Sequence, residues 1–188
     1  FYLKSKIGNL FPYSLFRHQS SDRSVCAGGI GLLSMVNFTE ISLIPSPVGW
    51  FPAHLIKFHT TQGDVQVLNL HLRPPLTKSA LPLPHAFFTS KSDRLAECKH
   101  YAQKLDLNLP IIVLGDFNEG EDAASVQFWK KDMKFQSALQ RHLDPECITW
   151  WWTVSGVTVT ARFDHIFYND KLECLDADVL IEGESDHH

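Results

Sequence analysis

The sequence lacks any apolar run of the roughly 20 residues that a membrane-spanning helix needs. Residues 1–6 also lack the basic stretch and apolar segment of a secretion signal. These absences predict a soluble protein without a transmembrane segment, and they favour an intracellular location. No internal repeat, low-complexity tract or flexible linker is visible, so residues 1–188 are expected to form one domain.

Positive charge is not in excess either. The chain has 17 Lys and Arg against 21 Asp and Glu, a formal charge of -4, which argues against a protein that holds polyanions mainly through a broad basic face. A local positive site is still compatible with this charge. Hydrophobic residues at 44% and charged residues at 20% exclude a disordered or fibrous chain.

The cysteines form no CxxC pair, which excludes a zinc knuckle and a dense disulfide framework. They lie far apart in the sequence and are expected to be scattered buried thiols. The four are Cys26, Cys98, Cys147 and Cys174.

Short apolar runs separated by Gly, Pro and Asn predict a meander of strands in the first half. The expected strands are residues 30–35, 41–44, 54–58 and 65–70. Residues 74–84 contain four prolines and predict a loop.

The second half alternates helices with strands. Ser90 or Ser92 can cap a helix whose apolar stripe is Leu95, Cys98, Ala102 and Leu105. A second helix is expected over residues 123–131, and strands over 111–114, 150–153, 162–168 and 177–181. The pattern predicts a single α/β or α+β sandwich.

Polar residues are concentrated at strand ends. Asn69, His71 and Arg73 share one face of a predicted strand, where a solvated face is the alternative to a site. Asp116 and Asn118 follow the apolar strand 111–114, and ordinary turn chemistry is the alternative there.

Two later segments add carboxylates and imidazoles. Arg162 and Asp164 alternate with Phe163 and His165, and an Arg162–Asp164 ion pair is the structural alternative. Asp186 and His187 stand in the last segment, which by itself could be a mobile polar tail.

In this order, the segments resemble the motif series of the endonuclease/exonuclease/phosphatase superfamily. The matching residues are His71, Asp116-Phe117-Asn118, Asp164 and Asp186-His187, together with a Gly-rich strand at residues 29–34. The resemblance runs from about Gly28 to His188. It implies two packed, mostly antiparallel β-sheets flanked by helices, as in deoxyribonuclease I.

The resemblance also implies roles for residues. Asp116 would orient or deprotonate the attacking water and Asn118 would contact a phosphate oxygen. His187 would contact the phosphoryl group, with Asp164 fixing its tautomer and favouring the imidazolium. His71 would bind a second phosphate oxygen.

The same resemblance implies Mg²⁺ as cofactor, with Mn²⁺ as the alternative, held by Asp186 together with Asp116 and Asn118. Asn69, Arg73 and Arg162 are further candidates for binding substrate, although structural ion pairs explain the two arginines equally well.

Two features of the family pattern are missing. No strand ending in Asn and no following strand with a metal-binding Glu precede Gly28, and no last core strand follows His188. The domain is therefore expected to be incomplete at both ends.

The main hypothesis is a divalent-metal-dependent phosphoesterase that hydrolyses a phosphodiester or phosphomonoester. The alternative is a non-catalytic binding module on the same fold. The substrate could be a nucleic acid, a phosphoinositide or a phospholipid. The three tryptophans of residues 150–152 could stack on bases, insert into lipid or pack in the core.

Overall fold

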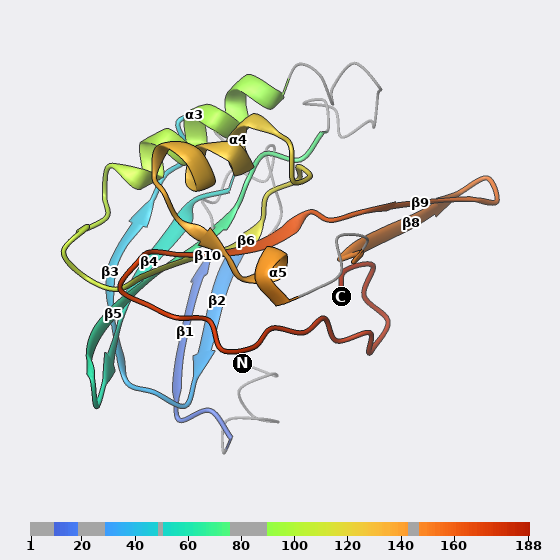
Figure 1. The fold of residues 1–188 in the computed structure, drawn as a ribbon. Coiled ribbons are helices and arrows are strands. Elements are labelled where there is room, and N and C mark those ends of the chain that lie inside the picture. The colour runs from blue at the N-terminus through green and yellow to red at the C-terminus, as the bar shows by residue number, and fades with distance from the viewer. Residues whose placement is uncertain (1–9, 19–28, 49–50, 76–89, 143–146) are drawn as a thin grey trace.

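The fold is built on a six-stranded sheet with the strand order β3-β4-β5-β6-β10-β7 (Figure 1). The computed structural model describes residues 10–18, 29–48, 51–75, 90–142 and 147–188. The strands of this main sheet are β3 (Phe38–Ile44), β4 (Ala53–Thr60), β5 (Gly63–His71), β6 (Ile111–Asp116), β7 (Gln136–Ser137) and β10 (Asp164–Tyr168). Neighbouring strands are antiparallel except β5 and β6, which are parallel.

Two smaller antiparallel pairs accompany the main sheet. β1 (Tyr13–His18) pairs with β2 (Gly29–Ser34), and the Arg17 side chain on β1 forms an ion pair of 2.9 Å with Glu40 on β3. β8 (Trp150–Val154) and β9 (Val157–Ala161) form a hairpin that projects away from the body of the protein (Figure 1).

The helices α3 (Lys91–Ala102) and α4 (Ala124–Gln127) cover one face of the main sheet (Figure 1). α4 continues into a π-helical turn, η1 (Phe128–Asp132), and α5 (Ala138–His142) follows β7. α3 lies in the connection between the parallel strands β5 and β6, because such a pair needs a crossover. None of the described helices is long and apolar enough to cross a membrane.

Strand alternation separates the two faces of the main sheet. Leu68, Val113 and Phe167 are partners across β5, β6 and β10, and all three are fully buried in the core beneath the helices. The next residue on each strand points to the opposite face. The residues with site chemistry on β5, β6 and β10 therefore lie on the face away from the helices.

Most of the predicted elements are confirmed. The strands β3, β4 and β5 form the expected meander, and the stripe of α3 packs on the core through buried Cys98 and partly buried Leu95, Ala102 and Leu105. The helix expected over 123–131 is present as α4 and η1. β1, β7, β9 and α5 were not predicted, and most of the proline-rich loop at 74–84 lies outside the described residues.

The strand predicted for residues 177–181 is wrong, because this segment adopts no regular structure. The carboxylates of Asp176 and Asp178 accept hydrogen bonds from the following backbone N–H groups of Ala177 and Val179, at 2.9 and 2.8 Å. Such local bonds compete with strand pairing. The apolar side chain of Ile181 is 76% exposed, so no burial favours a strand there.

The expectation of buried thiols is only partly right. Cys98 is fully buried on α3, whereas Cys147 and Cys174 are only partly buried and all three are free thiols. Cys26 lies outside the described residues.

A buried carboxylate on α3 joins this helix to two other segments. Glu97 accepts hydrogen bonds from the Ser46 hydroxyl at 2.6 Å and from the Arg73 backbone N–H at 2.9 Å. Burial raises the pKa of Glu97 to about 7, although both hydrogen bonds act in the opposite direction. The folded protein therefore holds this proton at pH values where the unfolded chain, with an ordinary pKa of 4.5, has released it.

The free energy of unfolding should consequently fall as the pH rises from about 4.5 to about 7, and then level off. In Glu97→Gln the amide can accept from Arg73 and donate to Ser46, so the decline should be smaller by on the order of 2 kcal/mol. Urea unfolding between pH 5 and pH 8 measures this difference, with Glu173→Gln at the exposed Arg141 pair as control. An equal decline in wild type and Glu97→Gln would contradict the assignment.

Candidate active site

The turn after β6 holds a carboxylate and an amide in fixed contact. The Asn118 backbone N–H donates to Asp116 Oδ1 at 2.7 Å, and the Asn118 side-chain amide donates to Asp116 Oδ2 at 3.2 Å. The same amide group donates to the Leu72 carbonyl at 3.0 Å, which ties the turn to the end of β5. The bonds to Asp116 Oδ2 and to the Leu72 carbonyl both use Asn118 Nδ2, so the amide oxygen takes part in neither.

Glycine is required immediately before this carboxylate. Gly115 has φ +135°, and a Cβ atom there would lie 1.9 Å from the Leu70 carbonyl oxygen on the neighbouring strand. Both the backbone conformation and the close approach exclude a larger residue. The end of β6 can therefore come close to β5 and place Asp116 beside the last residue of that strand.

Three strands bring three polar side chains into one row. His71 on β5, Asp116 on β6 and Asp164 on β10 are direct partners in the sheet register. His71 Nε2 lies 3.4 Å from Asp116 Oδ2. Because the row lies at the ends of these central strands, the three side chains stay partly accessible. His71, Asp116 and Asp164 are 41%, 16% and 30% exposed, respectively.

His187 completes this group from the far end of the chain. Its Nδ1 lies 2.9 Å from Asp164 Oδ2, and its Nε2 lies 3.9 Å from Asp116 Oδ2. The backbone of His187 forms a β-bridge with Trp150 at the base of the hairpin. The last segment of the chain is therefore held at the site by backbone pairing as well as by side chains.

The two members of the Asp116–His187 pair have pKa values shifted towards neutrality. Burial and the negative charge of Asp164 raise the pKa of Asp116 to about 6, against the effect of the Asn118 hydrogen bond and the His187 charge. Burial alone would lower the pKa of His187, but the hydrogen bond and charge of Asp164 raise it. His187 is therefore the imidazole of the site that favours the charged form.

The second imidazole behaves in the opposite way. The His71 ring stacks on Phe51, with 4.1 Å between ring centroids and 15° between the planes. The surrounding protein atoms, followed by the charge of His187, lower the pKa of His71 below its usual value of 6.5, although the side chain is 41% exposed. His71 is therefore neutral at pH 7, and Phe51 is a neighbour that sequence patterns did not indicate.

The remaining predicted site residues make contacts outside this group. Arg73 forms an ion pair with Asp93 on α3, and Arg162 Nε donates to the Cys147 carbonyl at 3.0 Å. The exposed Asp186 accepts a hydrogen bond from the Trp150 indole at 3.2 Å. Asn69 is on the same face of β5 as His71, one row further from the edge.

A buried ion pair that was not predicted lies directly behind the turn. Arg94 Nη2 on α3 lies 2.9 Å from Glu119 Oε1, and both side chains are at most 3% exposed. The Ser125 hydroxyl donates to the other Glu119 oxygen. Because Glu119 follows Asn118 in the chain, the ion pair fixes the end of the turn to helix α3.

The same cluster reaches the other strands of the site. Arg94 Nη1 donates to the Arg73 carbonyl at 3.1 Å, two residues beyond His71. His165 Nε2 is 2.9 Å from the Glu119 carbonyl, and His165 is the neighbour of Asp164 on β10. The cluster thus joins the β5, β6 and β10 ends from the helix side. The sequence signal for this cluster is the helical spacing that puts four residues on one stripe of α3: Arg94, Glu97, Cys98 and Tyr101.

The sequence matches the family model described as Endonuclease/Exonuclease/phosphatase family over residues 3–187. The chain belongs to the Endonuclease/Exonuclease/phosphatase family. The match begins upstream of Gly28, where the motif resemblance began. Comparison with curated proteins found no match.

Solved structures of the family share the fold. The human Nocturnin catalytic domain is 18% identical with a TM-score of 0.56, and the match covers 89% of this chain and 64% of that one. A family member from Beutenbergia cavernae is 15% identical with a TM-score of 0.66, covering 90% and 49%. Truncated TDP2 of Caenorhabditis elegans is 13% identical with a TM-score of 0.61, covering 87% and 63%.

These similarities confirm the mixed α/β fold of the deoxyribonuclease I type. The chain spans about half to two thirds of the length of these structures. Members of the Endonuclease/Exonuclease/phosphatase family are mostly hydrolases of phosphate esters and generally use divalent metals. Within the described ranges, no group of three or more His, Cys, Asp or Glu side chains is arranged to hold a metal ion.

Proposed function

We propose that this chain carries the catalytic group of a phosphoesterase that hydrolyses a phosphodiester or phosphomonoester by attack of an activated water. The observation that supports this proposal is the meeting of His71, Asp116 and the Asp164–His187 pair at one sheet edge. These residues come from three strands and the chain end. A carboxylate between two imidazoles combines a proton acceptor with donors for phosphoryl oxygens.

In this proposal, Asp116 takes the proton of the attacking water. It is the most enclosed member of the row, and its pKa of about 6 leaves it mainly ionised at pH 7 while keeping it a useful base. The two hydrogen bonds from Asn118 hold the carboxylate in one orientation. Asn118 is therefore proposed to position the base and to contact substrate.

His187 is proposed to bind the phosphoryl group through Nε2. Its Nδ1 faces Asp164, so Nε2 is the ring atom directed towards Asp116 and the reacting group. The positive charge of His187 would stabilise negative charge that develops on phosphoryl oxygens. Neutral His71 would supply a second, uncharged hydrogen bond.

The donor chemistry is compatible with Mg²⁺ or Mn²⁺ as a proposed cofactor. Mg²⁺ binds through one or two carboxylates and completes its shell with waters and substrate oxygens. Asp116, with the amide oxygen of Asn118, would hold it. When bound, the ion would neutralise charge on the phosphoryl oxygens. Asp186 stays a proposed ligand, although its carboxylate accepts the Trp150 hydrogen bond.

The test is hydrolysis of bis(p-nitrophenyl) phosphate and p-nitrophenyl phosphate at pH 7 with Mg²⁺, with Mn²⁺ and with EDTA. We expect release of p-nitrophenol that chelation abolishes and either metal restores. Equal rates with metal and with EDTA would overturn a metal-dependent mechanism. The sulfate anion in the human Nocturnin structure supports the choice of substrates, since sulfate and phosphate are both tetrahedral oxyanions.

A second candidate is a binding module on the same fold. It is favoured by the lack of a three-ligand metal group among the described residues. For a binding module, titration with Mg²⁺ would release no more heat than titration into buffer alone, and no substrate would be hydrolysed. Isothermal titration with Mg²⁺, run beside the hydrolysis assay, separates it from the enzyme.

A further inference from the structure

The projecting β8–β9 hairpin has one apolar and one hydroxyl-bearing face. Alternation places Trp150 and Trp152 of β8 on one face, opposite Ala161 and Val159 of β9. Val157 lies on the same face. This set, Trp150, Trp152, Val157, Val159 and Ala161, is called the apolar face below.

The other face of the hairpin contains threonines. Thr153, Thr158 and Thr160 lie there with Trp151, and the hydroxyls of Thr153 and Thr158 are 2.9 Å apart. Trp151, Thr158 and Thr160 also line a hollow against the C-terminal segment, with Val179 and Ile181. The structure thus covers part of the threonine face.

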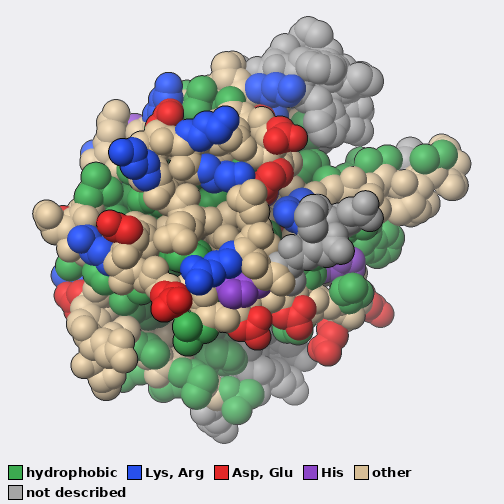
Figure 2. All heavy atoms as spheres, in the orientation of Figure 1, with side chains coloured by type: hydrophobic (Ala, Val, Ile, Leu, Met, Phe, Trp, Pro, Cys, Tyr) green, Lys and Arg blue, Asp and Glu red, His purple; other side chains and the backbone are tan. Residues whose placement is uncertain are grey.

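The apolar face stays open to solvent. Trp152, Val157 and Val159 are 47%, 65% and 53% exposed. In Figure 2 hydrophobic side chains extend along the hairpin without charged ones between them. Residues 148–161 contain no charged residue at all. An exposed apolar surface of this kind marks an interaction site.

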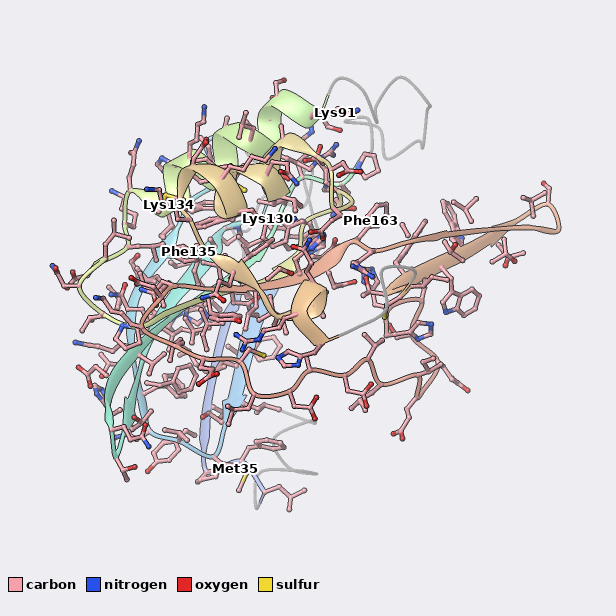
Figure 3. All side chains as sticks on the ribbon, viewed as in Figure 1. Met35, Lys91, Lys130, Lys134, Phe135 and Phe163 are labelled. Atoms are coloured by element: carbon pink, nitrogen blue, oxygen red, sulfur yellow. The ribbon has the colours of Figure 1, made fainter. Side chains whose placement is uncertain are left out.

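The apolar face leads to the candidate active site. The Trp150 ring packs on Phe163, with 5.0 Å between centroids, and Figure 3 shows Phe163 at the base of the hairpin. Phe163 lines a hollow together with Asn118 and Lys91. A ligand on the apolar face would therefore extend towards the Asp116–Asn118 turn.

The surrounding charge indicates which ligand fits. Residues 172–188 contain six Asp and Glu and no Lys or Arg, and this segment reaches the base of β8, where His187 bridges to Trp150. Figure 2 shows acidic side chains along this segment. A nucleic acid or an anionic membrane would be repelled, because both rely on basic side chains to neutralise phosphates. A neutral, zwitterionic surface meets no such repulsion.

We propose that the apolar face of the hairpin docks on a zwitterionic phospholipid surface and presents a phospholipid phosphodiester to the site. Tryptophan is suited to this location because its ring is apolar and its indole N–H favours the interfacial region. Valine side chains bury in the acyl boundary and the neutral threonines remain at the headgroups. The substrate part of the proposal rests on the proposed phosphoesterase function, whereas the docking part does not.

The test compares two tryptophans on opposite faces. Binding to phosphatidylcholine vesicles is measured by co-sedimentation for wild type, Trp152→Ala and Trp151→Ala, which remove similarly exposed rings. We expect wild type to bind, Trp152→Ala to bind at least about tenfold more weakly, and Trp151→Ala to change binding less than about threefold. Val159→Thr keeps the β-branched shape and should also weaken binding, which guards against misfolding of the alanine variant.

Two further arms identify the ligand. Vesicles containing phosphatidylserine and a single-stranded oligonucleotide should both bind more weakly than phosphatidylcholine. Stronger binding of either one, equal losses in the two tryptophan variants, or no binding of wild type to phosphatidylcholine would overturn the docking proposal. Because sedimentation needs no turnover, these results are independent of the hydrolysis assay. Loss of vesicle-substrate hydrolysis in Trp152→Ala, with soluble p-nitrophenyl ester turnover retained, would support the substrate assignment.

Discussion

Asp116→Asn is expected to lower kcat for phosphate ester hydrolysis by at least about a hundredfold. The amide has nearly the same shape as the carboxylate but cannot accept a proton from water. Asn118 donates to both Asp116 oxygens, so the new amide, with a single acceptor oxygen, keeps only one of these two hydrogen bonds in either orientation. Steady-state hydrolysis of bis(p-nitrophenyl) phosphate measures the loss.

Thermal unfolding of Asp116→Asn separates chemistry from folding. The substitution removes one of two neighbouring carboxylates from a largely enclosed position, which offsets the lost hydrogen bond from Asn118, so the melting temperature should change little. Asp132→Asn, at the exposed end of η1, is the matched control and should keep wild-type activity. A kcat for Asp116→Asn within tenfold of wild type would show that Asp116 is not the base.

Arg94→Met is expected to reduce the free energy of unfolding by about 3–5 kcal/mol. The substitution leaves the Glu119 carboxylate buried without its cation, and the guanidinium contacts with Ser90 and the Arg73 carbonyl are lost as well. A buried charge without a partner costs far more than the net contribution of the ion pair itself. Urea unfolding at pH 7 measures the change.

The chain contains a control for this experiment. Arg141 pairs with Glu173 at 3.5 Å on the surface, with the two side chains 47% and 69% exposed. Arg141→Met should change stability by less than about 0.5 kcal/mol. The double variant Arg94→Met with Glu119→Leu should recover much of the loss, because no charge is left unpaired. Loss below about 1 kcal/mol in Arg94→Met would contradict the role given to this ion pair.

The sequence predicted those parts of the fold in which local pattern and burial agree. The apolar run at 111–114 stops at a polar turn, and it became β6 with Asp116 at its end. Val126 and Trp129, three residues apart, are both fully buried as the helical spacing required. The segment 177–181 was mistaken for a strand because its apolar residues suit one, whereas strand formation depends on a pairing partner.

The helical stripe of α3 includes two charged residues, which a hydrophobic pattern alone does not place in the core. Arg94 and Glu97 lie on the buried stripe of α3, but burial of a charge is so costly that charged helix residues are normally placed in solvent. Their partners Glu119 and Ser46 come from distant segments of the chain. The stacking of Phe51 on His71 could not be predicted either, because the two residues come from separate segments and no spacing rule relates them.

The single parallel pair in the main sheet has a consequence for the order of folding. β3, β4 and β5 are joined by short connections, whereas Leu68 meets Val113 only after the chain has passed through α3, and Ile166 meets Leu114 only after η1, α5 and the hairpin. Contacts between distant segments form slowly, because the loss of chain entropy precedes any gain in contacts. The meander should therefore gain hydrogen-exchange protection first during refolding. The row His71, Asp116 and Asp164 spans all three strand ends and is among the last features to assemble.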